Sequence, residues 1–295
     1  MKPKSFARIL LLLSLACFCR AIPAETKASS SSLTVTFWNI QWFPGRGPNA
    51  SGAQAARQVR EVHRDMERLQ PDIIGLEEVR DFENASLAVQ ALPGFKVDVC
   101  SNFPPREGQT VAQQIVIASR LQPMSAWAEK WKTGEAITPP RGFAFAAYQI
   151  SPKQLLLVYA LHLKSNRGEI HEDMRIREES MRQLISHMRA MRDAYGKLGS
   201  LTWIVGGDFN TTPDDPRFAE EKTVSFLRAE DFRWAWQEIP AVDRITMPPD
   251  ARYPAACFDQ IFFRGAILTK AWVTETSPRS SDHRAVNAIL DLTIR

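Results

Sequence analysis

The sequence predicts a mixed α/β fold in which helices lie outside buried β-sheets. Short apolar runs rich in β-branched and aromatic residues alternate with two long amphipathic segments along the 295 residues. After residue 33 the chain contains no linker long enough to separate domains and no internal repeat. We therefore expect one folded domain over residues 34–295.

Seven apolar runs have the length and residue types of buried strands. They cover residues 34–40, 72–77, 113–118, 155–163, 201–206, 258–263 and 284–292.

Two segments between these runs have the spacing of amphipathic helices. Residues 53–70 place apolar side chains such as Val62 and Met66 three or four positions apart and stop before Pro71. Residues 169–197 repeat the pattern with many methionines. Core packing explains such a stripe better than a metal or ligand surface does.

The first 24 residues have the layout of a secretory signal peptide. They carry four bases (Lys2, Lys4, Arg8, Arg20) and no acid, so removing them from a net charge of +4 leaves the rest formally neutral. The apolar run over residues 9–18 is about half the roughly 20 residues that a spanning helix needs, and we expect no stable membrane span. Residues 25–33 form a Ser-rich linker.

Export would place the protein in a periplasm or outside the cell. A lipoprotein anchor at Cys17 is an alternative, although Leu15 lies one position too close to it for the usual motif. Export would leave Cys100 and Cys257 in an oxidising compartment. They can form one disulfide only if the fold brings them together.

Polar residues with catalytic potential stand at the ends of the predicted strands. They are Asn39, Glu77 and Glu78, His162, Asp208 and Asn210, and Asp282 and His283. Each alone is explained by a turn or a solvated strand end. Because rigid strands deliver side chains to one shared edge, the complete set favours a catalytic site.

This set of side chains suits the hydrolysis of a phosphoester. The substrate is anionic, so its oxygens must be neutralised and a water deprotonated. Carboxylate and amide oxygens hold a hard divalent cation, and a histidine oriented by a carboxylate serves as a general base. Asp259 lies in an otherwise apolar strand and needs a partner, for which His283 is a candidate.

Other chemistries lack their motifs. The segment His171-Glu172-Asp173-Met174-Arg175 begins like a zinc-protease helix but has no second histidine. The chain contains no Gly-x-Ser-x-Gly, no Walker-type phosphate loop and no Gly-x-Gly-x-x-Gly. Serine-hydrolase and nucleotide-cofactor functions are therefore disfavoured.

At these residues the sequence resembles the endonuclease/exonuclease/phosphatase superfamily, with its deoxyribonuclease-I-like fold. Five motifs carry the resemblance in the family's order: Trp-Asn-Ile, Leu-Glu-Glu-Val, Leu-His-Leu-Lys-Ser, Gly-Asp-Phe-Asn and Ser-Asp-His. The match extends from about residue 34 to residue 292. It implies a four-layer αββα sandwich, with two packed mixed β-sheets flanked by helices, and a hydrolase dependent on Mg²⁺, with Mn²⁺ or Ca²⁺ as alternatives.

The resemblance also implies roles for individual residues. Asn39, Glu78 and Asp282 correspond to metal residues, and Glu77 stands where the family usually has Gln, which leaves the number of metal ions open. The catalytic candidates are Asp208 and Asn210, which would orient the nucleophile and hold the phosphate, the base His283 paired with Asp259, and His162 on the phosphate or leaving group.

Three further residues are candidates for substrate contact. Arg120 ends the predicted strand 113–118 where the family often has a substrate-facing arginine, and an exposed strand-end cation explains it equally well. Lys164 and Asn166 follow His162 closely enough to reach substrate phosphates, or to close the loop instead.

The leading functional hypothesis is a weakly selective endonuclease on DNA, with RNA as a further substrate. Export and the bases around the His162 strand favour it. These bases are Lys164, Arg167, Arg175, Arg177 and Arg182, with acids interleaved among them. We expect a monomer, and the sequence identifies no protein partner.

Two alternatives remain. A sphingomyelinase or another phospholipid or inositol-phosphate hydrolase would need an apolar insertion, and only the aromatic clusters at 127–131 and 234–236 invite that idea. A non-enzymatic binding protein on the same scaffold is the other. It is disfavoured because every catalytic position holds a chemically competent residue.

Overall fold

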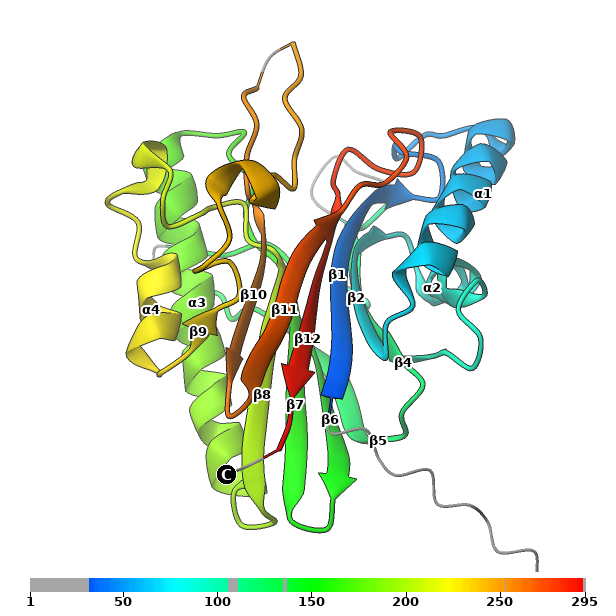
Figure 1. Cartoon of the computed structure of the whole chain (residues 1–295). Helices are drawn as coiled ribbons and strands as arrows, with labels where there is room; N and C mark the ends of the chain where they lie inside the picture. Colours follow the sequence, from blue (N-terminus) through cyan, green and yellow to red (C-terminus); the bar gives the residue numbers. More distant parts are fainter. Residues whose placement is uncertain (1–31, 106–110, 135–136, 252, 294–295) are drawn as a thin grey trace, which may run out of the picture. The chain divides into compact units, whose positions relative to one another are not determined.

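Two six-stranded mixed β-sheets pack against each other (Figure 1). The structure, a computed structural model, describes residues 32–105, 111–134, 137–251 and 253–293. The expected signal peptide (1–24) and all but two residues of the expected linker lie outside these ranges. The first strand begins at Ser32, two residues before the expected start at Thr34.

The first sheet has the strand order β11-β12-β1-β2-β4-β3 and the second β5-β6-β7-β8-β10-β9. The strands of the first sheet are β1 (Ser32–Phe43), β2 (Ile73–Val79), β3 (Lys96–Cys100), β4 (Gln114–Ser119), β11 (Ile267–Thr274) and β12 (Ala285–Asp291). The strands of the second sheet are β5 (Pro123–Lys130), β6 (Gly142–Ser151), β7 (Gln154–His162), β8 (Ser200–Asp208), β9 (Arg233–Trp234) and β10 (Asp259–Arg264).

Helices cover the outer faces of both sheets, so the predicted four-layer sandwich is confirmed (Figure 1). Helices α1 (Gly52–Leu69) and α2 (Phe82–Val89) lie on the first sheet, where Val62 and Met66 enter a buried cluster with β1 and β2. Helices α3 (Ile170–Tyr195) and α4 (Thr223–Ala229) lie on the second sheet. Two short 3₁₀ helices, η1 (Pro216–Phe218) and η2 (Ala241–Arg244), complete the described elements.

All seven predicted strands and both predicted helices are present, but five strands were not expected. Strands β3, β5, β9 and β11 are the four edge strands of the two sheets, and their burial patterns are mixed. Strand β6 is buried but rich in alanine, which has low strand propensity. A strand is recognised in a sequence by a run of large apolar residues or by their alternation with polar ones. A strand that mixes polar and apolar residues irregularly, or that is rich in alanine, shows neither pattern.

The directions of the strands bring the polar strand ends to one edge. Strands β1 and β2 are parallel, as are β7 and β8, so their last residues lie at the same end of each sheet. Strands β12 and β10 run antiparallel to these pairs and begin at that end; Asp259 pairs directly with Asp208. We call this end the catalytic edge.

Cys100, at the end of β3, and Cys257, before β10, are free thiols in the structure. They belong to segments of different sheets. The disulfide that the sequence allowed is not formed here.

A buried ion pair holds two loops of the catalytic edge to α3. The guanidinium of Arg177 is fully buried and donates to both carboxylate oxygens of Glu221 at 2.7 and 2.8 Å. It also donates to the carbonyl of Lys164 at 2.9 Å and to Asn166 Oδ1 at 2.7 Å, while Glu221 accepts from the Thr211 hydroxyl at 2.9 Å. The loops after β7 and β8 are therefore joined through one side chain.

We expect Arg177→Met to lower the free energy of unfolding by about 3–5 kcal/mol, because it leaves the buried carboxylate of Glu221 without its partner. Arg177→Met/Glu221→Gln should lose less, since no unpaired charge remains. Denaturant unfolding measures both. The control is Arg182→Met, which removes an exposed pair with Glu178 and Glu179 and should cost at most about 1 kcal/mol. Equal losses for Arg177→Met and Arg182→Met would contradict this account.

Candidate active site

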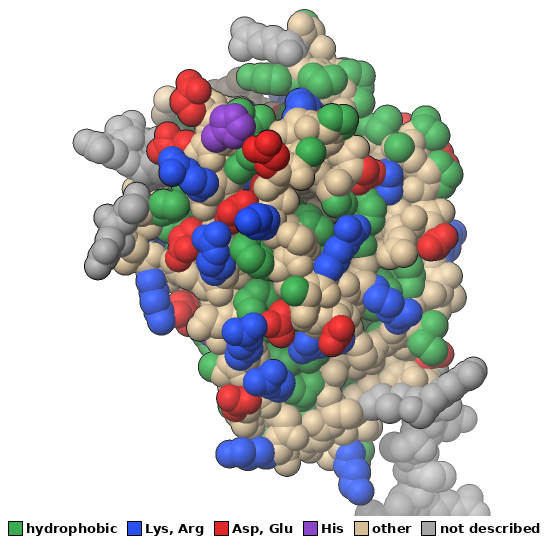
Figure 2. Space-filling view, turned by 90° about the vertical axis from the view of Figure 1, so that its left-hand side faces the viewer, with side chains coloured by type: hydrophobic (Ala, Val, Ile, Leu, Met, Phe, Trp, Pro, Cys, Tyr) green, Lys and Arg blue, Asp and Glu red, His purple; other side chains and the backbone are tan. Residues whose placement is uncertain are grey.

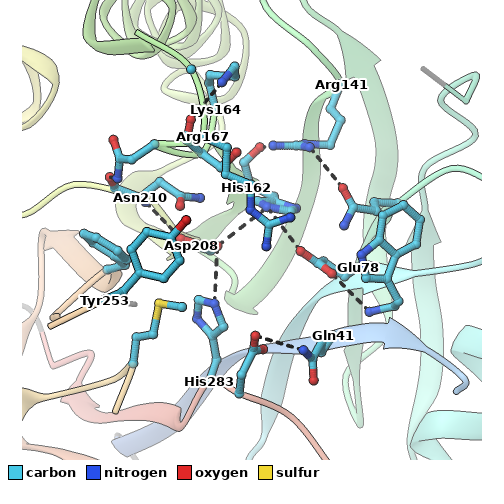
Figure 3. Close-up of a pocket in the computed structure, with 18 of the residues that line it drawn as sticks. Gln41, Glu78, Arg141, His162, Lys164, Arg167, Asp208, Asn210, Tyr253 and His283 are labelled. Atoms are coloured by element: carbon cyan, nitrogen blue, oxygen red, sulfur yellow. Dashed lines mark hydrogen bonds and ion pairs between the residues drawn. The ribbon is translucent and has the colours of Figure 1, made fainter. Parts of the chain in front are cut away.

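Polar side chains from the two sheets meet at the catalytic edge (Figure 3). Asn39, on β1 of the first sheet, donates from Nδ2 to Asp208 Oδ2 of the second sheet at 3.1 Å and lies 3.4 Å from Glu78 Oε1. Its own Oδ1 accepts the backbone N–H of Gln41 at 3.0 Å. Asn39 and Asp208 are buried, so this contact holds two carboxylates in a fixed, poorly solvated position.

Irregular backbone aims Glu78 into the site. The register between β2 and β4 shifts between Glu77 and Val79, so Glu78 is the extra residue of a bulge, and its φ is +61°. Its Oε2 accepts the N–H of Trp42 at 3.1 Å. In a regular strand, adjacent side chains point to opposite faces of the sheet. The bulge changes this alternation, so that Glu77 is buried between the sheets while Glu78 lines the cavity.

His162 ends β7 and faces both carboxylates. Its Nε2 is 3.7 Å from Glu78 Oε1 and 3.6 Å from Asp208 Oδ2. The ring is buried. An imidazole at this point can donate to an anionic oxygen bound between the two sheets.

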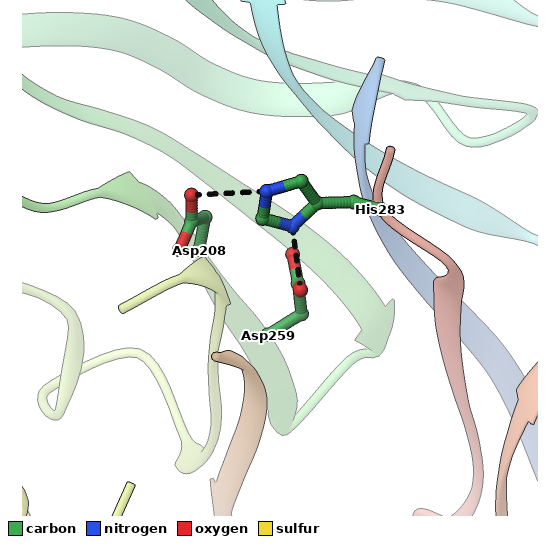
Figure 4. Close-up of side chains that lie close together, drawn as sticks. All are labelled: Asp208, Asp259 and His283. Atoms are coloured by element: carbon green, nitrogen blue, oxygen red, sulfur yellow. Dashed lines mark hydrogen bonds and ion pairs between the residues drawn. The ribbon is translucent and has the colours of Figure 1, made fainter. Parts of the chain in front are cut away.

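His283 and Asp259 form the histidine–carboxylate pair that the sequence suggested (Figure 4). His283 Nδ1 lies 2.8 Å from Asp259 Oδ2, and its other nitrogen lies 4.0 Å from Asp208 Oδ2. Burial lowers the pKa of His283, but the carboxylates of Asp259 and Asp208 outweigh it and raise that pKa well above its ordinary value. Asp259 thus orients the ring and stabilises its protonated form, as a general base requires.

The residues around Asp208 fit a divalent cation. Burial raises the pKa of Asp208 to about 7 and also raises the pKa of Glu78, so both carboxylates lack a full counter-charge. Their oxygens are the hard donors that Mg²⁺ and Ca²⁺ prefer. Among the described residues, ligand atoms of Asp208, Asp259 and His283 lie within 4.8 Å of one another. Because Asp259 and His283 are bonded to each other, Glu78 and Asp208 are the better-placed donors.

Glu77, which stands where the resembling family usually has Gln, lies between the sheets. It is fully buried, and neither carboxylate oxygen has a hydrogen-bond partner. Burial, with Asp259 and Asp208 nearby, raises the pKa of Glu77 well above its ordinary value. This environment favours the uncharged acid, so the extra glutamate need not add a second charge beside Glu78.

The remaining candidates line a cavity of about 680 Å³ above these residues. Asp282 lies on its wall and accepts from Gln41 Nε2 at 2.9 Å. Asn210, whose φ is +53°, donates its backbone N–H to Asp208 Oδ1 at 2.9 Å. Lys164 also lines the cavity but pairs with Asp173 at 2.5 Å.

Asn166 lines the cavity but is largely engaged within the protein. It donates to the carbonyl of Asn210 at 2.7 Å and accepts from Arg177. The contacts of Lys164 and Asn166 therefore agree with the second hypothesis from the sequence, that these residues close the loop after β7.

The structure corrects the expectation for Arg120. Strand β4 runs antiparallel to β2, so its last residue, Ser119, pairs with Ile73 at the end opposite to the catalytic edge. Arg120 follows Ser119 and bonds to the carbonyl of Pro93 at 3.0 Å; it does not line the cavity.

Arg141, which was not expected at the site, is an arginine that does lie at the catalytic edge. It donates to the carbonyls of His162 at 2.9 Å and Leu163 at 2.6 Å, and it lines the cavity. Sequence reasoning missed it because it precedes β6, the alanine-rich strand that was not expected. The cavity also includes Gln41 and Trp42, which have positive φ near the irregular end of β1, and Tyr253, which lies between η2 and β10.

The basic cluster after β7 is mostly neutralised. Lys164, Arg177 and Arg182 each pair with a carboxylate, whereas Arg167 lines the cavity. Figure 2 shows the face that α3 and α4 cover, where basic and acidic side chains are interspersed. Within the described part of the chain, no helix is long and apolar enough to cross a membrane.

Comparison with known proteins places this geometry in a family. Residues 36–283 match the model of the Endonuclease/Exonuclease/phosphatase family. No curated protein matches significantly in sequence.

Solved structures share the fold. An endonuclease/exonuclease/phosphatase from Beutenbergia cavernae DSM 12333 is 18% identical over 88% of this chain and 72% of its own, with a TM-score of 0.65. A family protein from Leptotrichia buccalis C-1013-b is 14% identical over 88% and 99%, with a TM-score of 0.64. TDP2 from D. rerio, complexed with a single strand DNA product, is 18% identical over 88% and 99%, with a TM-score of 0.62.

The identities to these structures are low, and they support the fold alone. The family model, by contrast, spans most of the chain and includes every motif at the catalytic edge from Asn39 to His283. The protein belongs to the endonuclease/exonuclease/phosphatase family.

Proposed function

We propose that this protein is an exported, divalent-metal-dependent phosphodiesterase that cleaves nucleic acid, as a weakly selective endonuclease on DNA and also on RNA. The observation that carries the proposal is the meeting of Glu78, His162 and Asp208 across the two sheets, next to the pair formed by His283 and Asp259. Each role in phosphodiester hydrolysis has a residue with suitable chemistry there.

Glu78 and Asp208 would hold the metal ion, with Asp282 on the adjoining wall, and Asn39 would position both carboxylates by donating to them from Nδ2. When bound, a divalent cation neutralises the phosphate oxygens and the charge that develops on the leaving oxygen; Mg²⁺ suits this oxygen-rich set.

The protein's own residues handle the protons. His283, oriented by Asp259, accepts a proton from a water positioned between its Nε2 and Asp208 Oδ2, which lie 4.0 Å apart. The oxygen of that water attacks phosphorus while the bond from phosphorus to the leaving oxygen breaks. His162 donates a hydrogen bond to the phosphate or the leaving oxygen, and Asn210 holds Asp208 in place.

Two observations favour nucleic acid over a membrane lipid as the substrate. Of the large apolar side chains exposed in the described residues, Phe82, Met124 and Ile267 belong to three different elements, α2, β5 and β11, whereas a membrane-binding surface needs such side chains next to one another. The similar TDP2 from D. rerio was crystallised with a single strand DNA product.

Plasmid nicking tests the metal requirement and the substrate class together. Purified protein should nick supercoiled plasmid in Mg²⁺ and lose this activity in chelator. Glu78→Gln should reduce nicking by about 10²-fold or more, because it removes a charged ligand with little change in shape. Plasmid nicking, RNA cleavage, sphingomyelin turnover and inositol-phosphate release are measured side by side. Lipid turnover without nicking would refute the nuclease proposal.

A change at Asp259 separates catalysis from folding at the histidine–carboxylate pair. Asp259→Asn should reduce kcat by about 10²–10⁴-fold while the melting temperature changes little, because Asn preserves the shape but no longer stabilises protonated His283. In the background of His283→Ala, the same change should have almost no further effect on kcat. Full additivity of the two changes would show that Asp259 does not act through His283.

A further inference from the structure

One wall of the catalytic cavity is apolar. A small hydrophobic cluster, separate from the main core, is formed by Met174, Phe218, Ala256 and Phe258, with Ile170 and Met247 packed against it. Four of these six residues, Ile170, Phe218, Met247 and Phe258, also line the cavity. We call this surface, together with Tyr253 and Pro254, the apolar wall.

Tyr253 extends the wall over the reaction centre. Its side chain is 50% exposed, although an aromatic ring of this size is usually covered. It lines the same cavity as Asp208 and Asn210, and Figure 3 shows its ring directed into that cavity. Among the described residues, no aromatic or cationic side chain stacks on this ring.

The hairpin that carries Tyr253 is fixed to the catalytic residues. At its base the fully buried Thr246 accepts the N–H of Asp259 at 3.1 Å through Oγ1 and the N–H of Arg284 through its carbonyl at 2.7 Å. Met247 and Ala256 pair as an antiparallel bridge, and near the tip Asp250 Oδ1 accepts the N–H of Tyr253 at 2.7 Å. The ring is therefore held in a defined place relative to His283 and Asp259.

The rest of the cavity lining is polar and carries charges of both signs, with the carboxylates of Glu78, Asp208 and Asp282 at the reaction centre. Arg141 and Arg167 lie on the lining as well, and Figure 3 shows both on the side of His162. A ligand that fills the cavity must present an anionic group to the reaction centre and a flat apolar group to the apolar wall. A nucleotide unit meets both requirements, since a phosphate and a base lie on neighbouring parts of one residue.

We propose that Tyr253 is a specificity-determining residue that stacks on the base next to the scissile phosphate, so that the enzyme prefers unpaired nucleotides. Every base has a π-face, and stacking on an aromatic side chain is tolerant of sequence. A base within a duplex is covered by its neighbours and cannot meet the ring. The inference rests on the proposed nuclease function and adds a preference for single-stranded or frayed nucleic acid over intact duplex.

The test uses a substrate with one scissile bond. Thymidylyl-thymidine and an analogue in which both bases are replaced by hydrogen are compared with Mg²⁺ present. Wild-type protein should hydrolyse the natural dinucleotide with a kcat/KM about ten-fold higher than that of the abasic analogue. Tyr253→Ala should remove this difference by lowering kcat/KM for the natural dinucleotide alone, whereas Tyr253→Phe should keep it.

A matched control and a duplex comparison complete the experiment. Phe82→Ala removes another exposed aromatic ring (55%) that does not line the cavity, and it should leave the ratio unchanged. Wild-type protein should cleave a single-stranded oligonucleotide at least about ten-fold faster than the same sequence in a duplex, and Tyr253→Ala should narrow that gap.

The outcomes separate this inference from the function on which it rests. Hydrolysis of DNA with an unchanged ratio in Tyr253→Ala, or with no preference for single strands, would overturn the inference and leave the nuclease function standing. Turnover of sphingomyelin alone, reduced by Tyr253→Ala, would overturn both and assign the apolar wall to a lipid.

Discussion

The close packing of the two sheets around Phe37 is the constraint on which the site depends. The fully buried Phe37 ring of β1 occupies the space where a side chain on Gly75 or Gly206 would stand; a Cβ at either glycine would lie 2.3 Å from the ring. The two glycines, one on each sheet, let β2 and β8 approach this ring. Two residues after Phe37, Asn39 can then reach across to Asp208.

The site is assembled from two sheets. Its residues lie at the ends of rigid strands, where the backbone becomes irregular. Glu78 and Asn210 adopt positive φ, as do Gln41 and Trp42 in the segment that binds Glu78. Such conformations cost about 1–3 kcal/mol each and persist only when the surroundings enforce them. Here the N–H of Asn210 donates to Asp208 and the N–H of Trp42 donates to Glu78, and these two hydrogen bonds hold the backbone in place. The backbone strain and the buried carboxylates are thus held by the same contacts.

The division between what could and could not be predicted from the sequence follows from this arrangement. Buried strands such as β7 have continuous apolar runs, and the polar residue at the end of each run marks the catalytic edge, so His162 and Asp208 could be found. Arg120 was expected at the site because the direction of β4 leaves no trace in a hydrophobic pattern, and Arg141 was missed because it precedes the unexpected strand β6. Tyr253 lies in a hairpin whose position is set by Thr246, a long-range contact without a local signal.

The distribution of charge limits how this protein could attract a polyanionic substrate. Outside the first 24 residues the chain is formally neutral, and many bases on and near α3 are paired with acids. Long-range attraction of a polyanion is weak under these conditions, and at physiological ionic strength charges more than about 8 Å apart are largely screened. If nucleic acid is the substrate, as proposed, binding would arise inside the cavity, from the basic side of Arg141 and Arg167, from the apolar wall and from the metal ion. A contact with the base would then be worth more to this protein than to a strongly basic nuclease, because no general phosphate attraction would supply the affinity in its place.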